Sequence, residues 1–597
     1  MVLQRIVYPT GATFEEDMYI RRDWNGVALI GEERTMRTFD NLNVVKFDTY
    51  FNTFSLAKWK KYTNLDRVML RIDIQGKARI TLTQMNLHGF DVDEYIVHSQ
   101  IVSGAERTTF TIPYPPCDGN DALSFRIRPL EKDLHVYGGA YITDMDEAAL
   151  PEVNIALAIC TYKREDYIAN NLEMLQRHVF GDETSFLRGH VRVYISDNGQ
   201  TLDAKALSNE NVRIFPNKNS GGSGGFSRGA IQAMSDPTYE PTHIILMDDD
   251  ITFDQYALER TYSFLRLMKP EYHISLLGGA MFRTDRRFIQ HAAGETHTLS
   301  GITFNKAGYN MYNILDIMRN EVEEKINYLG WWYCCIPVDL FKKRQYSLPL
   351  FVQYDDIEFS LRNNDVPKIT LNGICVWHIP FDKKWSGMKN YYTIRNRAIV
   401  NCMYFDGFTK KWFKRQLFRE CVRKTLQYSF KEANLALMAA EDFLKGMSWL
   451  REQDPVALNT AVSAMSDKLQ PLERLPILYD PRKLKRNDEI DTRQWRRLFR
   501  WMTLNGWLLP ANRTAIVEID NPQFQFLFRV RGVLKYDDAT SKGIVVEKSY
   551  REAFRIARRL LKVFGLIDLK FNQVVQEYQK THDEVISEEF WKRFLNF

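Results

Sequence analysis

The 597-residue sequence has few of the features that mark membrane proteins, secreted proteins and small metal-stabilised proteins. No apolar run approaches the roughly 18–20 residues that a membrane-spanning helix needs. The first residues, from Met1 to Ile6, lack the charged and apolar regions of a secretory signal. The seven cysteines are odd in number, form no CxxC pair and lie mostly in apolar stretches. They therefore indicate buried, reduced thiols and argue against a disulfide framework or a cysteine-based zinc site. We expect a cytoplasmic protein.

Internal repeats, low-complexity tracts and recognised nucleic-acid-binding motifs are also absent, so no nucleic-acid partner is expected. The sequence does have an ordinary composition, with 45% hydrophobic and 26% charged residues, which predicts a folded chain. Its net charge of +5 is unevenly spread, because residues 401–597 contain 35 Lys and Arg against 25 Asp and Glu. This excess predicts that the C-terminal third meets an anionic partner, which is either nucleic acid or the cytoplasmic face of a membrane, and the missing nucleic-acid motifs favour the membrane.

The hydrophobic pattern divides the chain into three expected domains. Residues 1–150 show alternating apolar and polar positions between turn signals, which predicts a β-sandwich. Within it, Val68 to Ile74 followed by a Gln75–Lys77 turn indicates a hairpin with one buried face. The length of the whole chain agrees with several domains, since it is too great for a single core.

Residues 151–400 alternate short apolar strands with helical segments, which predicts an α/β domain with a parallel sheet. Ligands in such sheets bind at the carboxyl ends of the strands. Residues 401–597 are mostly helical in pattern. The segments 410–424 and 493–501 combine basic residues with tryptophan. Each is typical of a basic amphipathic helix at a membrane interface, and equally of a surface helix with its aromatic residues in the core.

Three consecutive carboxylates, Asp248, Asp249 and Asp250, follow the apolar run 244–247. Like charges repel, and burying them without compensation is unfavourable by several kcal/mol. Carboxylates two residues apart on an extended segment point to the same side, so Asp248 and Asp250 can face one ion. A hard oxygen site of this kind suits Mg²⁺ or Mn²⁺ holding a diphosphate. Taken alone, the triplet also fits an ordinary acidic turn.

Other predicted strands also end in residues that can contact a ligand. The first predicted strand is followed by a threonine hydroxyl and two positively charged side chains in 160–164, and the second strand is followed by Asp197. The segment 217–229 has four glycines within five residues, which leaves the backbone open to close approach. It is neither a Walker loop, since no GK[ST] follows, nor a Rossmann fingerprint. Further along, Asp355 and Asp356 precede a helix-like stretch, and His378 ends another apolar run.

In this order, these residues resemble the GT-A nucleotide-sugar glycosyltransferases of the large inverting family 2. The resemblance implies a GT-A, Rossmann-like central domain. It also implies a divalent cation, Mn²⁺ somewhat more than Mg²⁺, at Asp248, Asp250 and His378. Asp356 would be the base that deprotonates the acceptor hydroxyl, and Asp355 would orient the acceptor. The implied donor-binding residues are Thr161, Arg164, Asp197, Asn219, Arg228 and Asp249.

A narrower resemblance is to bacterial galactofuranosyltransferases that polymerise galactan. It is carried by the segment 330–333, by Glu295 after Gly294, and by the stretches 47–54 and 59–63. It implies UDP-galactofuranose as donor, a lipid-linked glycan acceptor and a peripheral position on the inner face of the membrane. The implied acceptor-binding residues are Trp331, Trp332, Glu295 and Tyr354. Tyr354 departs from the pattern, because those enzymes have tryptophan there, so the acceptor and the linkage stay open.

Two alternatives to this reading are kept. The same mechanism could use another donor, such as an activated rhamnose or galactopyranose. A non-catalytic glycan-binding scaffold with a decayed transferase domain is the other, although decay should have removed at least one of Asp248, Asp250, Asp356 and His378, and all four are present. A homo-oligomer is compatible with the sequence but is not indicated by it.

Overall fold

The computed structural model describes residues 1–9, 15–22, 27–30, 35–38, 44–116, 122–381, 386–475, 484–485, 493–538 and 540–597. The chain forms two compact units. The first unit contains residues 1–217, 225–346 and 360–379, and therefore both the N-terminal and the central domain. The second unit contains residues 218–224, 347–359 and 380–597.

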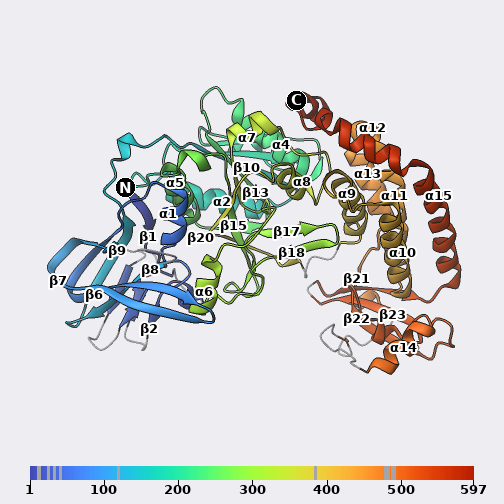
Figure 1. Cartoon of the computed structure of the whole chain (residues 1–597), viewed down its shortest axis with the longest axis horizontal. Helices are drawn as coiled ribbons and strands as arrows, with labels where there is room; N and C mark the ends of the chain where they lie inside the picture. The colour runs from blue at the N-terminus through green and yellow to red at the C-terminus, as the bar shows by residue number, and fades with distance from the viewer. Residues whose placement is uncertain are drawn as a thin grey trace. The chain divides into compact units, whose positions relative to one another are not determined.

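The N-terminal domain is mainly β, as predicted, and also contains the short helix α1 (Leu56–Tyr62). Among the described residues its nine strands are hydrogen-bonded as one sheet, in the order β2-β5-β8-β6-β9-β4-β3, with β1 on β9 and β7 on β6. The two long strands β6 and β7 stand out in Figure 1. The strands are β1 (Val2–Arg5), β2 (Arg21–Arg22), β3 (Val27–Ile30), β4 (Thr35–Thr38), β5 (Val45–Lys46), β6 (Met69–His88), β7 (Asp91–Pro113), β8 (Ala122–Pro129) and β9 (His135–Ile142).

The turn predicted at Gln75–Lys77 is wrong, because β6 runs through it. Gly76 has φ +105° and lies at a register shift between β6 and β7, so the glycine forms a β-bulge. The alternation on either side is as expected: Leu70 and Ile72 before the bulge and Ile80 after it are fully buried. A glycine with positive φ fits a turn and a bulge equally well, so the local sequence did not separate the two.

The central domain is built on a mixed sheet, in the order β12-β11-β10-β13-β19-β15-β20-β14, with β16 on β15. The first four of these strands are parallel, as predicted. The strands are β10 (Ile155–Thr161), β11 (Val191–Asp197), β12 (Val212–Pro216), β13 (His243–Asp248), β14 (Ile251–Thr252), β15 (Leu276–Arg283), β16 (Gln290–Ala292), β19 (Cys334–Pro337) and β20 (Lys368–His378). A separate hairpin joins β17 (Glu295–Thr298) to β18 (Gly301–Phe304).

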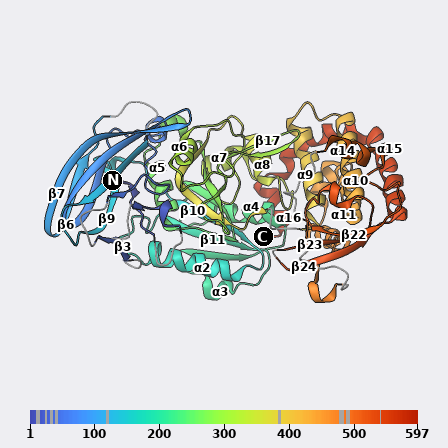
Figure 2. The same cartoon turned by 90° about the horizontal axis from the view of Figure 1, so that it is seen from below.

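Helices follow the strands of this sheet, and Figure 2 shows α2 and α3 together on one side of β10 and β11. The helix α5 is the most deeply buried of them along its length, with every residue from Gln255 to Leu265 buried. The helices from the N-terminus to the end of the central region are α1 (Leu56–Tyr62), α2 (Glu165–Leu175), α3 (Ala204–Leu207), α4 (Gly221–Met234), α5 (Gln255–Arg266), α6 (Ile314–Glu321), α7 (Val338–Arg344) and α8 (Asp355–Arg362).

The N-terminal sheet and the central domain share a polar and aromatic contact within the first unit. Arg5 Nε lies 3.0 Å from Glu259 Oε2 on α5, and Lys58 Nζ donates to the Thr370 carbonyl at 2.8 Å. Tyr50 packs edge-on against Phe282 of β15, with ring centroids 5.0 Å apart. The two domains are therefore held together by buried contacts.

The second unit is mainly helical, as predicted. Its helices are α9 (Lys389–Tyr404), α10 (Lys410–Leu426), α11 (Phe430–Phe443), α12 (Gly446–Glu452), α13 (Pro455–Met465), α14 (Gln494–Met502), α15 (Tyr550–Thr581) and α16 (Glu588–Leu595). The long helix α15 begins at an N-cap, Ser549, and buries one stripe from Ile556 to Tyr578. This unit also contains a four-stranded sheet that was not predicted, formed by β21 (Gln470–Pro471), β22 (Arg513–Glu518), β23 (Val530–Asp537) and β24 (Lys542–Glu547).

The two basic, tryptophan-containing segments differ in their surroundings. In α10, Lys410 Nζ donates to the Asp568 carbonyl at 3.1 Å, and Lys414 Nζ lies 2.5 Å from Asp568 Oδ2 on α15. Trp412 packs against Phe408. In α14, by contrast, no residue is buried, and Trp495 and Trp501 are 65% and 76% exposed. The interpretation as a packed surface helix therefore fits α10, whereas α14 leaves its tryptophans exposed.

Candidate functional site

Two strand ends bring the predicted metal ligands together. The strand β13 ends at Asp248, and after one turn the chain forms β14, which pairs with the end of β20 so that Ile251 lies opposite His378. The acidic turn that leaves β13 therefore leads into a strand that is hydrogen-bonded to β20. Asp250, one residue before Ile251, is carried to the side of the His378 imidazole.

The resulting cluster consists of Asp248, Asp250 and His378, whose candidate ligand atoms all lie within 4.8 Å of one another. His378 Nε2 lies 3.0 Å from Asp250 Oδ1. His378 is 2% exposed and Asp250 is 7% exposed, so both are removed from bulk water. Two carboxylates and an imidazole at this spacing suit a divalent cation of the Mn²⁺ or Mg²⁺ type.

Three of the predicted donor-binding residues surround this cluster. Asp249 Oδ2 accepts from the Tyr162 N–H at 3.0 Å, which ties the acidic turn to the end of β10. Burial and the charge of Asp250 raise the pKa of the Asp249 carboxyl above its ordinary value. Arg164 Nη2 lies 3.9 Å from Asp250 Oδ2, and the side chain is half-exposed. A positively charged guanidinium group therefore lies at the solvent side of the cluster. Thr161 is buried beside them at the end of β10.

Asp197 is placed at the end of β11 next to Thr161, as the parallel register requires. Its carboxylate accepts from three backbone N–H groups, those of Gly199 at 3.0 Å, Thr201 at 2.7 Å and Leu202 at 2.8 Å. The residue is 1% exposed. The geometry gives Asp197 a clear task in shaping the 198–202 turn. Its contact with a nucleotide stays a prediction.

The glycine-rich segment permits close packing of helix α4 on strand β10. A Cβ at Gly225 would lie 2.1 Å from Cys160 Sγ, and one at Gly229 would lie 3.0 Å from the Ala158 side chain, so α4 lies directly on β10. Asn219 Oδ1 accepts from the Gly221 N–H at 3.2 Å. Arg228, on the same helix, lies over the Phe215 ring, and burial lowers its pKa to about 10.

The residues predicted to contact the acceptor within the first unit form one buried group. Trp331 and Trp332 are 5% and 6% exposed, and Trp332 Nε1 donates to the Gly279 carbonyl at 2.8 Å. Glu295 Oε2 accepts from the Gly330 N–H at 3.2 Å. Glu295 thereby anchors the turn that carries both tryptophans. Sugar stacking by these rings stays a prediction.

The second carboxylate pair belongs to the second unit and opens α8. Asp355 is buried, accepts from the Ser223 hydroxyl at 3.2 Å, and has its pKa raised by burial to about 6. Asp356 is partly exposed, as a base for an incoming hydroxyl must be. Glu358 is fully buried and accepts from the Tyr404 hydroxyl at 2.7 Å, so its setting is that of a structural residue. Tyr354 is buried, with φ +70°.

Two groups near these sites were not singled out from the sequence. Phe51, in the N-terminal domain, packs against Trp377, the neighbour of His378, with ring centroids 6.1 Å apart. Arg395 and Asn396 of α9 are fully buried and bond the backbone just before α8. The available signal was a run of three polar residues, 395–397, between Ile394 and Ala398 in a helical pattern.

Comparison with known proteins points to one family. Residues 3–144 match the family model described as "Galactofuranosyltransferase 2 N-terminal", and residues 156–313 match "Glycosyl transferase family 2". The chain is 26% identical over 430 residues to galactofuranosyltransferase GlfT2 of Mycolicibacterium smegmatis, which covers 67% of this chain and 64% of that protein. It is 27% identical over 432 residues to GlfT2 of Mycobacterium tuberculosis, with 67% and 65% covered. The match therefore spans slightly less than two thirds of these relatives.

Among solved structures, a mannosyltransferase from Pyrobaculum calidifontis, determined in complex with GDP-Man and Mn²⁺, aligns with 54% of this chain and 81% of its own. The identity is 13% and the TM-score 0.28, so this likeness carries no argument about the site.

Proposed function

We propose that this chain, which has the GT-A fold and a family 2 glycosyltransferase domain and resembles the galactofuranosyltransferases, transfers galactofuranose from UDP-galactofuranose to a hydroxyl of a glycan acceptor. The observation that carries the proposal is the convergence of Asp248, Asp250 and His378 at the carboxyl end of β13. The N-terminal domain matches a galactofuranosyltransferase model, and both similar relatives are galactofuranosyltransferases, which favours this sugar over rhamnose or galactopyranose.

The side chains of Asp248, Asp250 and His378 fit a divalent cation, Mn²⁺ or Mg²⁺. Two carboxylates and an imidazole lie within 4.8 Å, and the adjacent carboxylate of Asp249 adds negative charge. When bound, the cation would neutralise the diphosphate of the donor and so stabilise UDP as the leaving group. Arg164 and the end of β10 would bind the rest of the nucleotide diphosphate, together with Thr161, Asp197, Asn219 and Arg228.

Asp356 is the proposed base and Asp355 orients the acceptor. As the acceptor oxygen forms its bond to the anomeric carbon, the bond from that carbon to the UDP oxygen breaks, and Asp356 takes the proton of the attacking hydroxyl. One displacement inverts the anomeric carbon. The Asp356 carboxylate is partly exposed, whereas Glu358 is buried under Tyr404, which favours Asp356 over Glu358.

The acceptor is proposed to be a lipid-linked cell-surface polysaccharide, approached at the inner face of the membrane. Trp331, Trp332, Glu295 and Tyr354 would line its path, since sugar faces stack on aromatic rings. No helix among the described residues is long and apolar enough to span a bilayer. The exposed tryptophans and the arginines of α14 suit a peripheral contact with anionic lipid instead.

The test is to incubate the purified protein with a short galactan acceptor and a panel of nucleotide sugars, and to measure UDP or dTDP release. UDP-galactofuranose should be used with Mn²⁺ or Mg²⁺, and EDTA should abolish the activity. Asp356→Asn should lower turnover by about 10²–10⁴-fold while UDP-sugar affinity is roughly kept.

Other outcomes are informative as well. Preferential use of dTDP-rhamnose or UDP-galactopyranose would replace the donor and keep the mechanism. Full activity in EDTA would contradict the cation role, and no turnover with any donor despite glycan binding would support the scaffold alternative.

A further inference from the structure

The backbone just before α8 is held in an unfavourable conformation. Phe351, Gln353 and Tyr354 have φ values of +76°, +64° and +70°, in the left-handed region that residues with side chains avoid. Such residues persist only where their surroundings over-determine them, and they cluster at functional sites. This segment, residues 350–354, is called the acidic-pair loop here because it runs directly into Asp355 and Asp356. Whatever holds the loop therefore also sets the direction of those carboxylates.

Two fully buried residues of α9 bind this loop through its carbonyl groups. Asn396 Nδ2 lies 3.1 Å from the carbonyl oxygen of Leu350, 2.8 Å from that of Val352 and 2.9 Å from that of Gln353. Arg395 Nη2 donates to the Leu350 carbonyl at 2.7 Å. The helix α9 thus supplies donors to three carbonyl groups of the irregular loop, of which that of Leu350 also accepts from the Val352 N–H within the loop at 3.2 Å.

The two side chains are themselves fixed. Arg395 Nε donates to Asn396 Oδ1 at 2.9 Å, which orients the amide so that its N–H groups face the loop. The Arg395 guanidinium lies over the rings of Tyr391 and Tyr392, at 5.3 and 5.2 Å. The Tyr391 hydroxyl donates to Asp442 Oδ2 of α11 at 2.6 Å. The donors are pre-organised before any substrate arrives.

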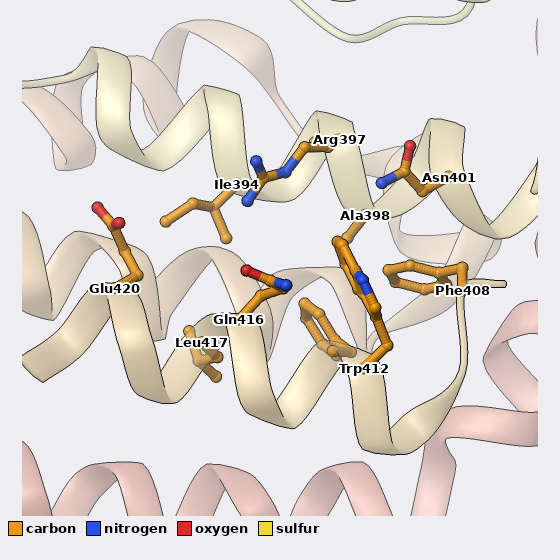
Figure 3. Close-up of a pocket in the computed structure, with 10 residues that line it drawn as sticks. Ile394, Arg397, Ala398, Asn401, Phe408, Trp412, Gln416, Leu417 and Glu420 are labelled. Carbon is orange, nitrogen blue, oxygen red and sulfur yellow. The ribbon is translucent and has the colours of Figure 1, made fainter. Parts of the chain in front are cut away.

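The remaining contacts of α9 leave it little freedom. Tyr392 stacks on Phe351 with ring centroids 5.1 Å apart, and the Thr393 hydroxyl donates to Gln353 Oε1 at 2.6 Å. Another part of α9 faces α10, where Arg397 and Asn401 border a pocket of about 10 Å³ that Trp412 and Gln416 line from the other side (Figure 3). That volume holds about one water molecule. The helix α9 packs more extensively on α11.

The start of α4 confines the loop as well. Gly221 has φ +66°, and a Cβ there would lie 2.0 Å from the Phe351 carbonyl oxygen. The Ser223 N–H donates to the same oxygen at 3.3 Å, while its hydroxyl donates to Asp355. The close approach at Phe351 explains why glycine stands at 221.

We propose that Asn396 and Arg395 are positioning residues, which hold the acidic-pair loop in its left-handed conformation and thereby aim Asp355 and Asp356 at the acceptor. The catalytic part of this inference rests on the function proposed above for Asp356. The mechanical part, that α9 holds the loop, does not depend on which reaction is catalysed.

The experiment compares Asn396→Ala with Asn401→Ala in the full chain. Both asparagines are fully buried on α9, but Asn401 borders the pocket next to α10. Backbone amide hydrogen exchange is measured for peptides covering 347–358. We expect exchange there to rise about tenfold or more in Asn396→Ala and to stay near wild type in Asn401→Ala.

Kinetics and donor binding are measured on the same proteins. Misplacement of a reacting group by about 1 Å lowers turnover by about 10²-fold, so kcat should fall about 10- to 100-fold in Asn396→Ala. The Kd for UDP should stay within about twofold of wild type. The hydrogen bonds of the Asn396 amide N–H groups in the described structure go to the loop, and not to the residues proposed to bind the nucleotide sugar. Asn401→Ala should lower the melting temperature without a matching loss of kcat.

Each outcome decides between parts of the inference. Unchanged exchange at 347–358 in Asn396→Ala overturns it, whatever the enzyme does. Raised exchange with normal kcat overturns the positioning role and leaves only a structural one. If wild type shows no transferase activity while exchange still rises in Asn396→Ala, the proposed function fails, and the inference that α9 holds the acidic-pair loop is kept. Should Asn396→Ala not accumulate as folded protein, Thr393→Val removes only the bond to Gln353, and the same readouts apply with smaller changes.

Discussion

Asp355 and Asp356 are adjacent in the sequence but have different surroundings. Asp355 is buried, whereas Asp356 is partly exposed. Burial raises the pKa of Asp355 to about 6, with the charge of Glu358 acting in the same direction. An unfolded aspartate ionises near about 3.9, so between these two values the folded chain binds more protons than the unfolded chain. The stability from this group is thus present below about pH 4 and lost as pH rises through about 6.

We therefore expect Asp355→Asn, which cannot ionise, to gain stability relative to wild type as pH rises from 5 to 8. The gain is at most about 3 kcal/mol, from a pKa shift of about two pH units. The measurement is the difference in melting temperature between variant and wild type at several pH values.

The matched control is Asp454→Asn. Hydrogen bonds from Ala457 N–H and Lys218 lower the pKa of Asp454, so this group is already charged in both states above pH 5. Its effect on stability should be constant from pH 5 to 8. A flat difference for Asp355→Asn as well would contradict the assigned environment of Asp355.

The helices α10 and α14 show how similar composition can serve different ends. Two basic residues of α10, Lys410 and Lys414, bind Asp568 of α15 within the second unit. The helix α14 has four arginines in or beside it and leaves its apolar side chains exposed, including Leu498 at 56%. An amphipathic helix with exposed tryptophans is suited to lie in the headgroup region of a bilayer.

From this difference we predict that α14 carries the binding to anionic membranes. Replacing Trp495 and Trp501 together by alanine should lower sedimentation with anionic liposomes about tenfold or more, because two large apolar side chains no longer enter the interface. Binding of wild type should weaken as salt rises.

Lys414→Glu on α10 is the control. It should lower the melting temperature, through repulsion with Asp568, and leave liposome binding nearly unchanged. Equal loss of binding in both variants, or equal binding of wild type to neutral and anionic vesicles, would assign the exposed α14 face to another partner.

At the scale of the whole chain, features signalled by local sequence were predicted and features fixed by distant contacts were not. The α/β domain followed from alternating apolar strands and helices. Asp248 and Asp250 were proposed as metal ligands from the acidic turn at a strand end, whereas His378 was implied by the family resemblance. The bulge at Gly76 was misread because its positive φ suits a turn equally well. The Lys414 contact joins residues 154 apart in sequence, and the Asn396 contacts join residues 43 to 46 apart, so neither has a local signature.

The metal cluster links the fold of the first unit to the binding of a cation. Asp248, Asp250 and His378 come from β13, the following turn and β20, segments that only the folded sheet brings together. A cation that binds this set binds the folded chain and not the unfolded one, so it must raise stability. At 100 times its Kd, Mn²⁺ should stabilise the first unit by about 2.7 kcal/mol.

The expected result is a rise in melting temperature with Mn²⁺ that EDTA reverses and that Asp250→Asn abolishes. Asp339→Asn is the control, since Asp339 is an exposed carboxylate of the same unit outside the cluster, and this variant should keep the full rise. The readout requires no donor, acceptor or turnover. A rise that persists in Asp250→Asn would move the cation to other ligands, whereas loss of the rise together with loss of activity would tie the same three side chains to both the fold and the chemistry.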